Sequence, residues 1–176
     1  MNFEALGDWL SDNAAQEEVD QKLLSKIKPY LTNTINRAMQ LHINYLQLHR
    51  KSSSLSGGEN QRVALIKQLN SPLKGITYLL DEPSAGLSSD NIPDLINILK
   101  ELIEKGNTVM VIEHNKEIIM AGDQLVGLGP KAGKHGGEIV AMGTPEDIMK
   151  NKKSLTGQYL SGKVRFSIKR KLHKGR

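Results

Sequence analysis

The spacing of apolar and polar residues divides the chain into a helical first part and a second part in which helices and strands alternate. Within residues 1–50, Leu24 and Ile27 recur at helical spacing, and Pro29 is expected to end that helix before a second one begins. Trp9, the only tryptophan, is expected to anchor a core. Residues 1–50 therefore predict a helical segment that precedes the main domain.

From Ser56 onward, segments of helical and strand character follow one another. Helices are predicted at 59–69, 90–105 and 116–120 and as a last helix capped at Thr144, and strands at 76–80, 108–112, 125–128 and 138–142. The strand at 76–80 is apolar enough to be buried, and four residues of the helix at 90–105 are expected to face inward: Leu95, Leu99, Leu102 and Ile103. This order predicts an α/β fold with a mainly parallel sheet flanked by helices and functional groups at the carboxyl ends of the strands.

Composition narrows the class of protein. The 176 residues suit one domain, and 38% hydrophobic with 24% charged residues is typical of a soluble globular protein. No apolar stretch is long enough to span a bilayer, and the first residues lack the features of a signal peptide, so we expect a cytoplasmic protein without membrane contact. The absence of cysteine excludes disulfides and thiolate zinc sites, so no zinc is expected.

The net charge of +5 is concentrated toward the end of the chain, because residues 163–176 form a basic tail without any acidic residue. Such a tail can neutralise the phosphates of nucleic acid. A solvated terminus is the simpler explanation of such a tail, because charge alone is a weak motif. The candidate DNA-binding residues of this tail are Lys163, Arg165, Lys169, Arg170 and Lys171.

Residues 55–62, with the sequence Leu-Ser-Gly-Gly-Glu-Asn-Gln-Arg, combine a helix cap with two glycines. Ser56 and Glu59 have the spacing of a capping box, which is a purely structural explanation of this stretch. A cap does not need Gly57 and Gly58, each of which costs up to about 1 kcal/mol against alanine inside a helix. Two glycines let a ligand approach the exposed N–H groups, and a helix N-terminus favours an anion.

Acidic residues and a histidine follow the next two predicted strands. Asp81 and Glu82 come directly after the strand at 76–80, and Glu113 and His114 after the strand at 108–112. Two adjacent carboxylates at the end of a buried strand need a reason, because removing them from water costs several kcal/mol. A magnesium site and activation of a water molecule supply that reason.

These motifs, in this order and spacing, resemble the signature, Walker B and switch-histidine motifs of ATP-binding cassette (ABC) ATPases. The resemblance implies that Asp81 holds Mg²⁺ through a water, that Glu82 polarises the attacking water and that His114 contacts the γ-phosphate. The resemblance also implies roles for two further sets of residues. The signature residues, which would contact ATP held by an opposing half, are Leu55, Ser56, Gly57, Gly58, Glu59, Gln61 and Arg62. The D-loop residues, which would lie along the dimer seam, are Ser84, Ala85, Gly86 and Leu87.

Three further stretches, at 106–109, 129–137 and 154–162, narrow the resemblance to the UvrA family, the DNA-damage-recognising ABC ATPases of bacterial nucleotide excision repair. The match covers residues 51–162 and corresponds to the carboxyl-terminal part of one nucleotide-binding half. Gly-Pro-x-Ala-Gly-x-His-Gly-Gly at 129–137 is not typical of transporter cassettes, which disfavours a transporter subunit. The sequence departs from the family in lacking the cysteine pairs of its zinc modules and in having Asn115 where aspartate is usual.

A Walker A loop, which would cradle the phosphates of ATP, is missing from the sequence. The nearest match, at 157–164, places Val164 where a serine or threonine must bind Mg²⁺, and Tyr159 and Leu160 crowd the loop. We therefore expect ATP and Mg²⁺ to bind only at a composite site, completed by a Walker A-containing chain or by the remainder of the same protein. A fragment, a split subunit and a degenerate paralogue that acts only as a module binding a partner or nucleic acid all fit this pattern.

Overall fold

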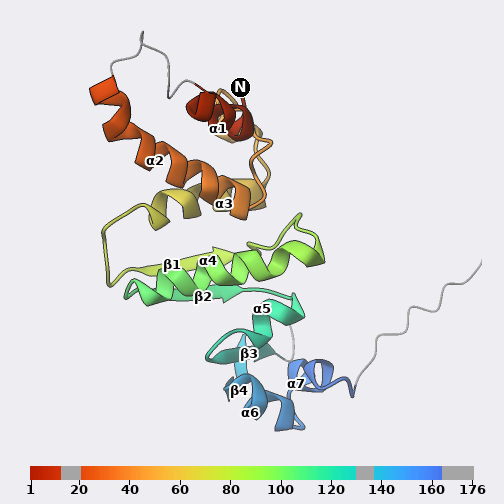
Figure 1. The fold of residues 1–176 in the computed structure, drawn as a ribbon. Helices are drawn as coiled ribbons and strands as arrows, with labels where there is room; N and C mark the ends of the chain where they lie inside the picture. Colours follow the sequence, from red (N-terminus) through yellow and green to blue (C-terminus); the bar gives the residue numbers. More distant parts are fainter. Residues whose placement is uncertain (13–20, 130–136, 164–176) are drawn as a thin grey trace, which may run out of the picture. The chain divides into compact units, whose positions relative to one another are not determined.

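The structure is a computed structural model that describes residues 1–12, 21–129 and 137–163 (Figure 1). It divides the chain into two compact units, Met1–Asn115 and Lys116–Arg176, each of which we describe by itself. The helices that it describes include none with the length and apolar character needed to cross a membrane.

The first unit begins with two helices, α1 (Phe3–Asp12) and α2 (Gln21–Gln40), which pack against each other. Their shared core consists of Leu10, Leu24 and Ile35, with Phe3, Leu6 and Leu31 partly buried around it. Pro29 lies inside α2, so the prediction that it ends the helix was wrong. A proline removes only one backbone donor, and the packing of α2 on α1 offsets that loss. Trp9 was also predicted wrongly, since it is an exposed side chain rather than a core anchor.

The rest of the first unit is a helix–strand–helix–strand arrangement. Helix α3 (Gly57–Leu69) leads to strand β1 (Thr77–Asp81), and α4 (Ile92–Glu104) leads to strand β2 (Thr108–Ile112). The two strands pair in parallel, which confirms the predicted parallel arrangement for this part of the fold. Short 3-10 turns, η2 (Ser52–Ser54) and η3 (Ser89–Asn91), precede α3 and α4.

One face of the β1–β2 sheet is apolar and exposed, although the sequence predicted a buried strand. Helix α4 packs on β2 and lies alongside both strands in Figure 1. Side chains that alternate to the other face have exposed fractions of 68% at Leu79, 55% at Met110 and 58% at Ile112. In α4, Leu95, Leu99 and Leu102 face inward as predicted, but Ile103 is exposed.

The second unit contains the short helix α5 (Lys116–Met120), two strands and two further helices. Strands β3 (Leu125–Gly129) and β4 (Glu138–Gly143) pair antiparallel, so the mainly parallel arrangement that the sequence predicts does not extend to this pair. Only eight residues, 130–137, separate the two strands along the chain, and a connection this short allows only the antiparallel arrangement.

The predicted last helix, α6 (Pro145–Lys150), starts at a complete capping box between Thr144 and Asp147. It is followed by α7 (Leu155–Leu160), which the sequence analysis did not predict. A Cβ atom on Gly157 would lie 1.9 Å from the Ile148 carbonyl oxygen, so this glycine is required where α7 packs on α6. Its place in a packed helix agrees with the rejection of 157–164 as a phosphate-binding loop.

Candidate functional site

The N-terminus of α3 is held by the capping box that the sequence predicted. The Ser56 Oγ accepts a hydrogen bond of 3.2 Å from the Glu59 backbone N–H, and the Glu59 carboxylate accepts one of 2.7 Å from the Ser56 N–H. Because the serine hydroxyl uses only an acceptor lone pair in this cap, its own proton can still be donated to a ligand.

The Glu59 side chain is fully engaged inside the protein. Its second carboxylate oxygen accepts a hydrogen bond of 2.5 Å from the Tyr45 hydroxyl. This bond and the one from the Ser56 backbone lower the pKa of Glu59 from 4.5 to about 2. Glu59 therefore shapes the N-terminus of α3, and its carboxylate does not face an incoming phosphate.

The two signature glycines differ in their surroundings. A Cβ atom on Gly57 would meet nothing within 4 Å, so its backbone is open to an approaching group. A Cβ atom on Gly58 would lie 2.6 Å from the Ala85 carbonyl oxygen, and Gly58 is buried. Gly57 therefore borders open space, whereas close packing against Ala85 explains the glycine at position 58.

Gln61 and Arg62 connect α3 to the end of β1 and the D-loop. The Gln61 side-chain amide donates a hydrogen bond of 2.5 Å to the Asp81 carbonyl oxygen. Arg62 is only 3% exposed, and its Nη1 donates to the Ala85 carbonyl oxygen at 2.9 Å. Burial lowers the pKa of the Arg62 guanidinium below its ordinary value. These two side chains hold α3 against the end of β1 and the turn at residues 84–87.

Asp81 and Glu82 are both exposed at the carboxyl end of β1. The pair stands at the strand end as predicted, but it is not buried, so the predicted desolvation cost was wrong. Glu82 has a φ angle of 48°, a left-handed backbone conformation that is rare for a residue with a side chain. Such strained residues are found preferentially at functional sites.

The parallel register brings the ends of β1 and β2 together, and with them Glu82 and His114. The His114 Nδ1 lies 3.4 Å from a Glu82 carboxylate oxygen, and both side chains are largely exposed. The Glu82 backbone N–H donates to the Ile112 carbonyl oxygen at 2.9 Å, which extends the sheet pairing one residue past Asp81. A group bound beside one of these side chains is within reach of the other.

The D-loop, Ser84 to Leu87, is a tight turn that follows Glu82 and Pro83. The Leu87 N–H donates to the Ser84 carbonyl oxygen at 2.9 Å, and Gly86 adopts a positive φ of 78° that favours glycine. Ser84 is buried and Leu87 half-buried, whereas Ala85 and Gly86 are exposed. The exposed turn is the part available to another molecule.

Glu113 is a site residue that the sequence analysis did not single out. One of its carboxylate oxygens accepts a hydrogen bond of 3.0 Å from the Ser84 N–H. The other accepts bonds of 3.0 Å and 3.1 Å from the N–H groups of His114 and Asn115. Burial opposes ionisation, but a hydrogen bond from the Ser84 side chain together with these backbone hydrogen bonds outweighs it and lowers the pKa of Glu113. The sequence signal that could have identified Glu113 is its position directly between an apolar strand and a histidine.

The donor groups present fit part of an ATP site. Exposed carboxylates at Asp81 and Glu82 are hard oxygen ligands of the kind that Mg²⁺ prefers. The open N–H groups near Gly57 and the Ser56 hydroxyl suit a phosphate. The sequence has no Walker A motif whose lysine would hold the β- and γ-phosphates.

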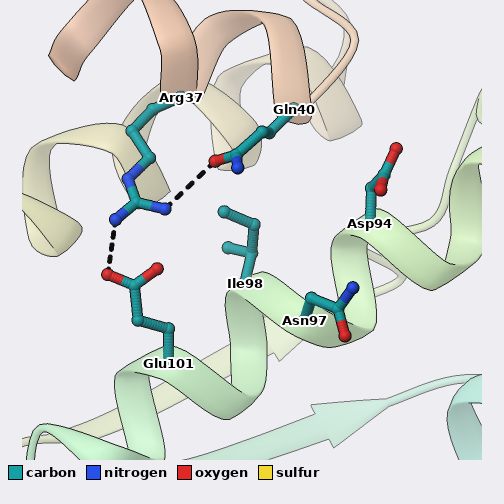
Figure 2. Close-up of a pocket in the computed structure, with 6 residues that line it drawn as sticks. All are labelled: Arg37, Gln40, Asp94, Asn97, Ile98 and Glu101. Carbon is teal, nitrogen blue, oxygen red and sulfur yellow. Dashed lines mark hydrogen bonds and ion pairs between the residues drawn. The ribbon is translucent and has the colours of Figure 1, made fainter.

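A pocket in the same unit lies away from these motifs (Figure 2). Arg37 of α2 points across it and forms an ion pair of 2.5 Å with Glu101 of α4 and a hydrogen bond of 3.0 Å with Gln40. His42 and Asp94 form a second contact of 2.9 Å between the same regions. Because its charged groups already pair with each other, this pocket is an interhelical contact and not a ligand site.

The remaining predicted residues lie at the edge of the described structure or outside it. Lys163 is exposed at the end of the described residues. Arg165, Lys169, Arg170 and Lys171 lie outside them, as do residues 130–136 of the stretch at 129–137. The DNA-binding prediction for the tail thus stays a prediction.

Comparison with known proteins places this site in a family context. No protein-family model matches the chain. UvrABC system protein A of Staphylococcus aureus is 47% identical to it over 156 residues, which are 89% of this chain and 16% of that protein. The Staphylococcus epidermidis protein of the same name is 45% identical over 157 residues, covering 89% of this chain and 17% of that protein. The chain is homologous to UvrABC system protein A.

A solved structure agrees with this homology. The crystal structure of UvrA2 from Deinococcus radiodurans matches 95% of this chain and 22% of its own, with a TM-score of 0.86 and 34% sequence identity. The chain therefore has the α/β fold of a UvrA-type ABC ATPase segment. It spans about a sixth of the length of the curated relatives that it matches.

Proposed function

We propose that this chain supplies the signature, Walker B and switch-histidine elements of a composite ATP site of the UvrA type. A second polypeptide, or the remainder of the same protein, would supply the Walker A loop and hold the phosphates. In this role Glu82 polarises the attacking water, Asp81 holds the magnesium ion through a water, and His114 contacts the γ-phosphate.

One observation carries the proposal: four motifs that are separate in sequence are joined in the first unit by direct contacts. Gln61 and Arg62 join the signature helix to β1 and the D-loop, at 2.5 Å and 2.9 Å. Glu113 joins the D-loop to the residues after β2, and His114 lies 3.4 Å from Glu82. Such an arrangement is expected where several loops must act on one nucleotide.

The biological setting is a second part of the proposal. The homology to UvrABC system protein A supports a role in nucleotide excision repair, as part of an ATPase that acts on DNA. The basic residues Lys163, Arg165, Lys169, Arg170 and Lys171 are the candidate contacts to DNA phosphates in this chain.

Equilibrium binding of Mg·ATP tests the composite site. The chain alone should bind ATP weakly, because nothing in it cradles the phosphates. Mixed with S. aureus UvrABC system protein A from which the aligned 156-residue segment has been removed, it should restore binding, and Ser56→Ala should reduce the restored binding by roughly tenfold. Tight Mg·ATP binding by the chain alone would contradict the proposal.

The alternative is a module without catalytic function that binds a partner or nucleic acid through its basic tail. The uneven charge of the sequence favours it. DNA binding measured at several salt concentrations, with and without residues 163–176, separates the two. A large loss of DNA affinity on truncation, together with no effect of the chain on ATP binding in the mixture, would favour the alternative.

A further inference from the structure

The carboxylate of Glu113 is the meeting point of two loops that are distant in sequence. Ser84, the first residue of the D-loop, donates its backbone N–H to one oxygen at 3.0 Å. His114 and Asn115, which follow β2, donate theirs to the other oxygen at 3.0 Å and 3.1 Å. Three main-chain donors from both sides of the site thus converge on one side chain.

We propose that Glu113 is a positioning residue that locks the D-loop and the switch-histidine loop together, so that Ser84 and His114 keep a fixed relative position. The effect of Glu113 on ATP turnover rests on the proposed function. Its effect on the positions of the two loops does not depend on that function.

The hydrogen-bonding pattern distinguishes this role from that of a general base. Both Glu113 oxygens accept from main-chain N–H groups, and the side chain is half-buried. Glu82, in contrast, is exposed beside His114. A base must have an oxygen free for the proton that it takes, and Glu82 fits this requirement better than Glu113.

The D-loop has a second contact, with the helix α3. Ala85, next to Ser84, accepts a hydrogen bond of 2.9 Å from Arg62 of the signature helix. The D-loop is therefore held from one side by Arg62 and from the other by Glu113. A displacement at Glu113 should change the position of the D-loop and that of His114 together, because Glu113 accepts hydrogen bonds from both segments.

Replacing Glu113 by glutamine is the sharpest variant. Glutamine has nearly the same shape but only one acceptor oxygen, and its NH₂ group would face N–H donors that need an acceptor. At least one of the two loops must then lose its contact. Glu104→Gln, at an exposed position in α4 of the same unit, is the matched control.

Amide hydrogen exchange on the chain itself gives the first readout. Glu113→Gln should speed exchange by roughly tenfold or more at Ser84, at His114 and Asn115, or at all three, while the amides of the β1–β2 ladder keep their protection. Glu104→Gln should change none of them. Unchanged exchange at the three amides would overturn the proposal, and so would an equal loss along the whole ladder, which would indicate a general loss of stability.

Steady-state ATP turnover, in the mixture with the truncated S. aureus protein, gives the second readout. Glu113→Gln should lower kcat by roughly tenfold or more and change KM less than about twofold, because misplaced groups affect the transition state more than binding. If Glu82→Gln abolishes turnover and Glu113→Gln leaves both constants unchanged, the proposed function stands and the catalytic role of Glu113 is overturned. If the wild-type mixture has no turnover, the proposed function fails, and the exchange experiment alone decides whether Glu113 positions the loops.

Discussion

Gly57 and Gly58 are neighbours in sequence, yet an added methyl group would meet different surroundings at each. At Gly58 it would lie 2.6 Å from the Ala85 carbonyl oxygen, and at Gly57 it would meet nothing within 4 Å. Gly58→Ala should lower the free energy of unfolding by about 1–3 kcal/mol through overpacking. Gly57→Ala should leave it unchanged or raise it by up to about 1 kcal/mol, because alanine favours a helix. Urea unfolding of both variants measures these changes in the free energy of unfolding. An equal change at the two positions would contradict the conclusion that only Gly58 is closely packed.

Glu59 should make the stability of the protein depend on pH in the acid range. Its pKa falls from 4.5 to about 2 on folding, because Tyr45 and Ser56 donate hydrogen bonds to its carboxylate. The stabilisation is therefore complete above pH 4.5 and is lost as the pH falls toward 2. Glu59→Gln should reduce the free energy of unfolding by on the order of 1–3 kcal/mol at pH 6, and the difference from wild type should shrink toward pH 2.

Urea unfolding at several pH values checks this prediction. Glu113 and Asp147 also have lowered pKa values, so only the difference between wild type and variant isolates Glu59. Glu104→Gln serves as control, since it should follow wild type at every pH. A wild-type-to-variant difference that does not change with pH would show that the Glu59 carboxylate is not held as described.

At the scale of elements, Gly157 joins the last two helices. A Cβ atom there would lie 1.9 Å from the Ile148 carbonyl oxygen, and no flexible side chain can move aside to admit it. Gly157→Ala should therefore destabilise the second unit by roughly 3 kcal/mol or more, while the exposed neighbour substitution Thr156→Ala should have little effect. Amide exchange by mass spectrometry should show lost protection in α6 and α7 with protection retained in α3 and α4. Retained protection in α6 and α7 would contradict this packing.

Elements that depend on neighbouring residues were predictable from the sequence. The capping boxes at Ser56 and Thr144 need only residues three positions apart, and the structure contains both. The strand ends that carry Asp81 and His114 were predicted because apolar runs mark strands locally. The predicted parallel pairing of those strands is confirmed.

Features that depend on distant residues were not predictable in the same way. Pro29 lies within α2 because of packing against α1, which the local sequence does not encode. Glu113 was not singled out because one of its partners, Ser84, is 29 residues away. The explanation of Gly58 likewise required the position of Ala85, which only the folded chain provides.

At the scale of the whole molecule, all the residues that resemble the signature, Walker B, D-loop and switch-histidine motifs belong to the first unit, Met1–Asn115. This unit carries an exposed apolar sheet face at Leu79, Met110 and Ile112. The second unit also has exposed apolar side chains on its sheet, where Val126 lies opposite Met142 on the two antiparallel strands. Apolar surface of this kind is typical of regions that contact other polypeptide.

The central claim is that the chain contributes catalytic groups to a nucleotide bound elsewhere. The most direct measurement is ATP turnover by the chain alone, by S. aureus UvrABC system protein A lacking its aligned 156 residues, and by their mixture. The intact S. aureus protein is the positive control. We expect turnover from the mixture only, with Glu82→Gln in this chain lowering it by roughly 100-fold or more. Turnover by the chain alone, or a mixture whose turnover is insensitive to Glu82→Gln, would contradict the account.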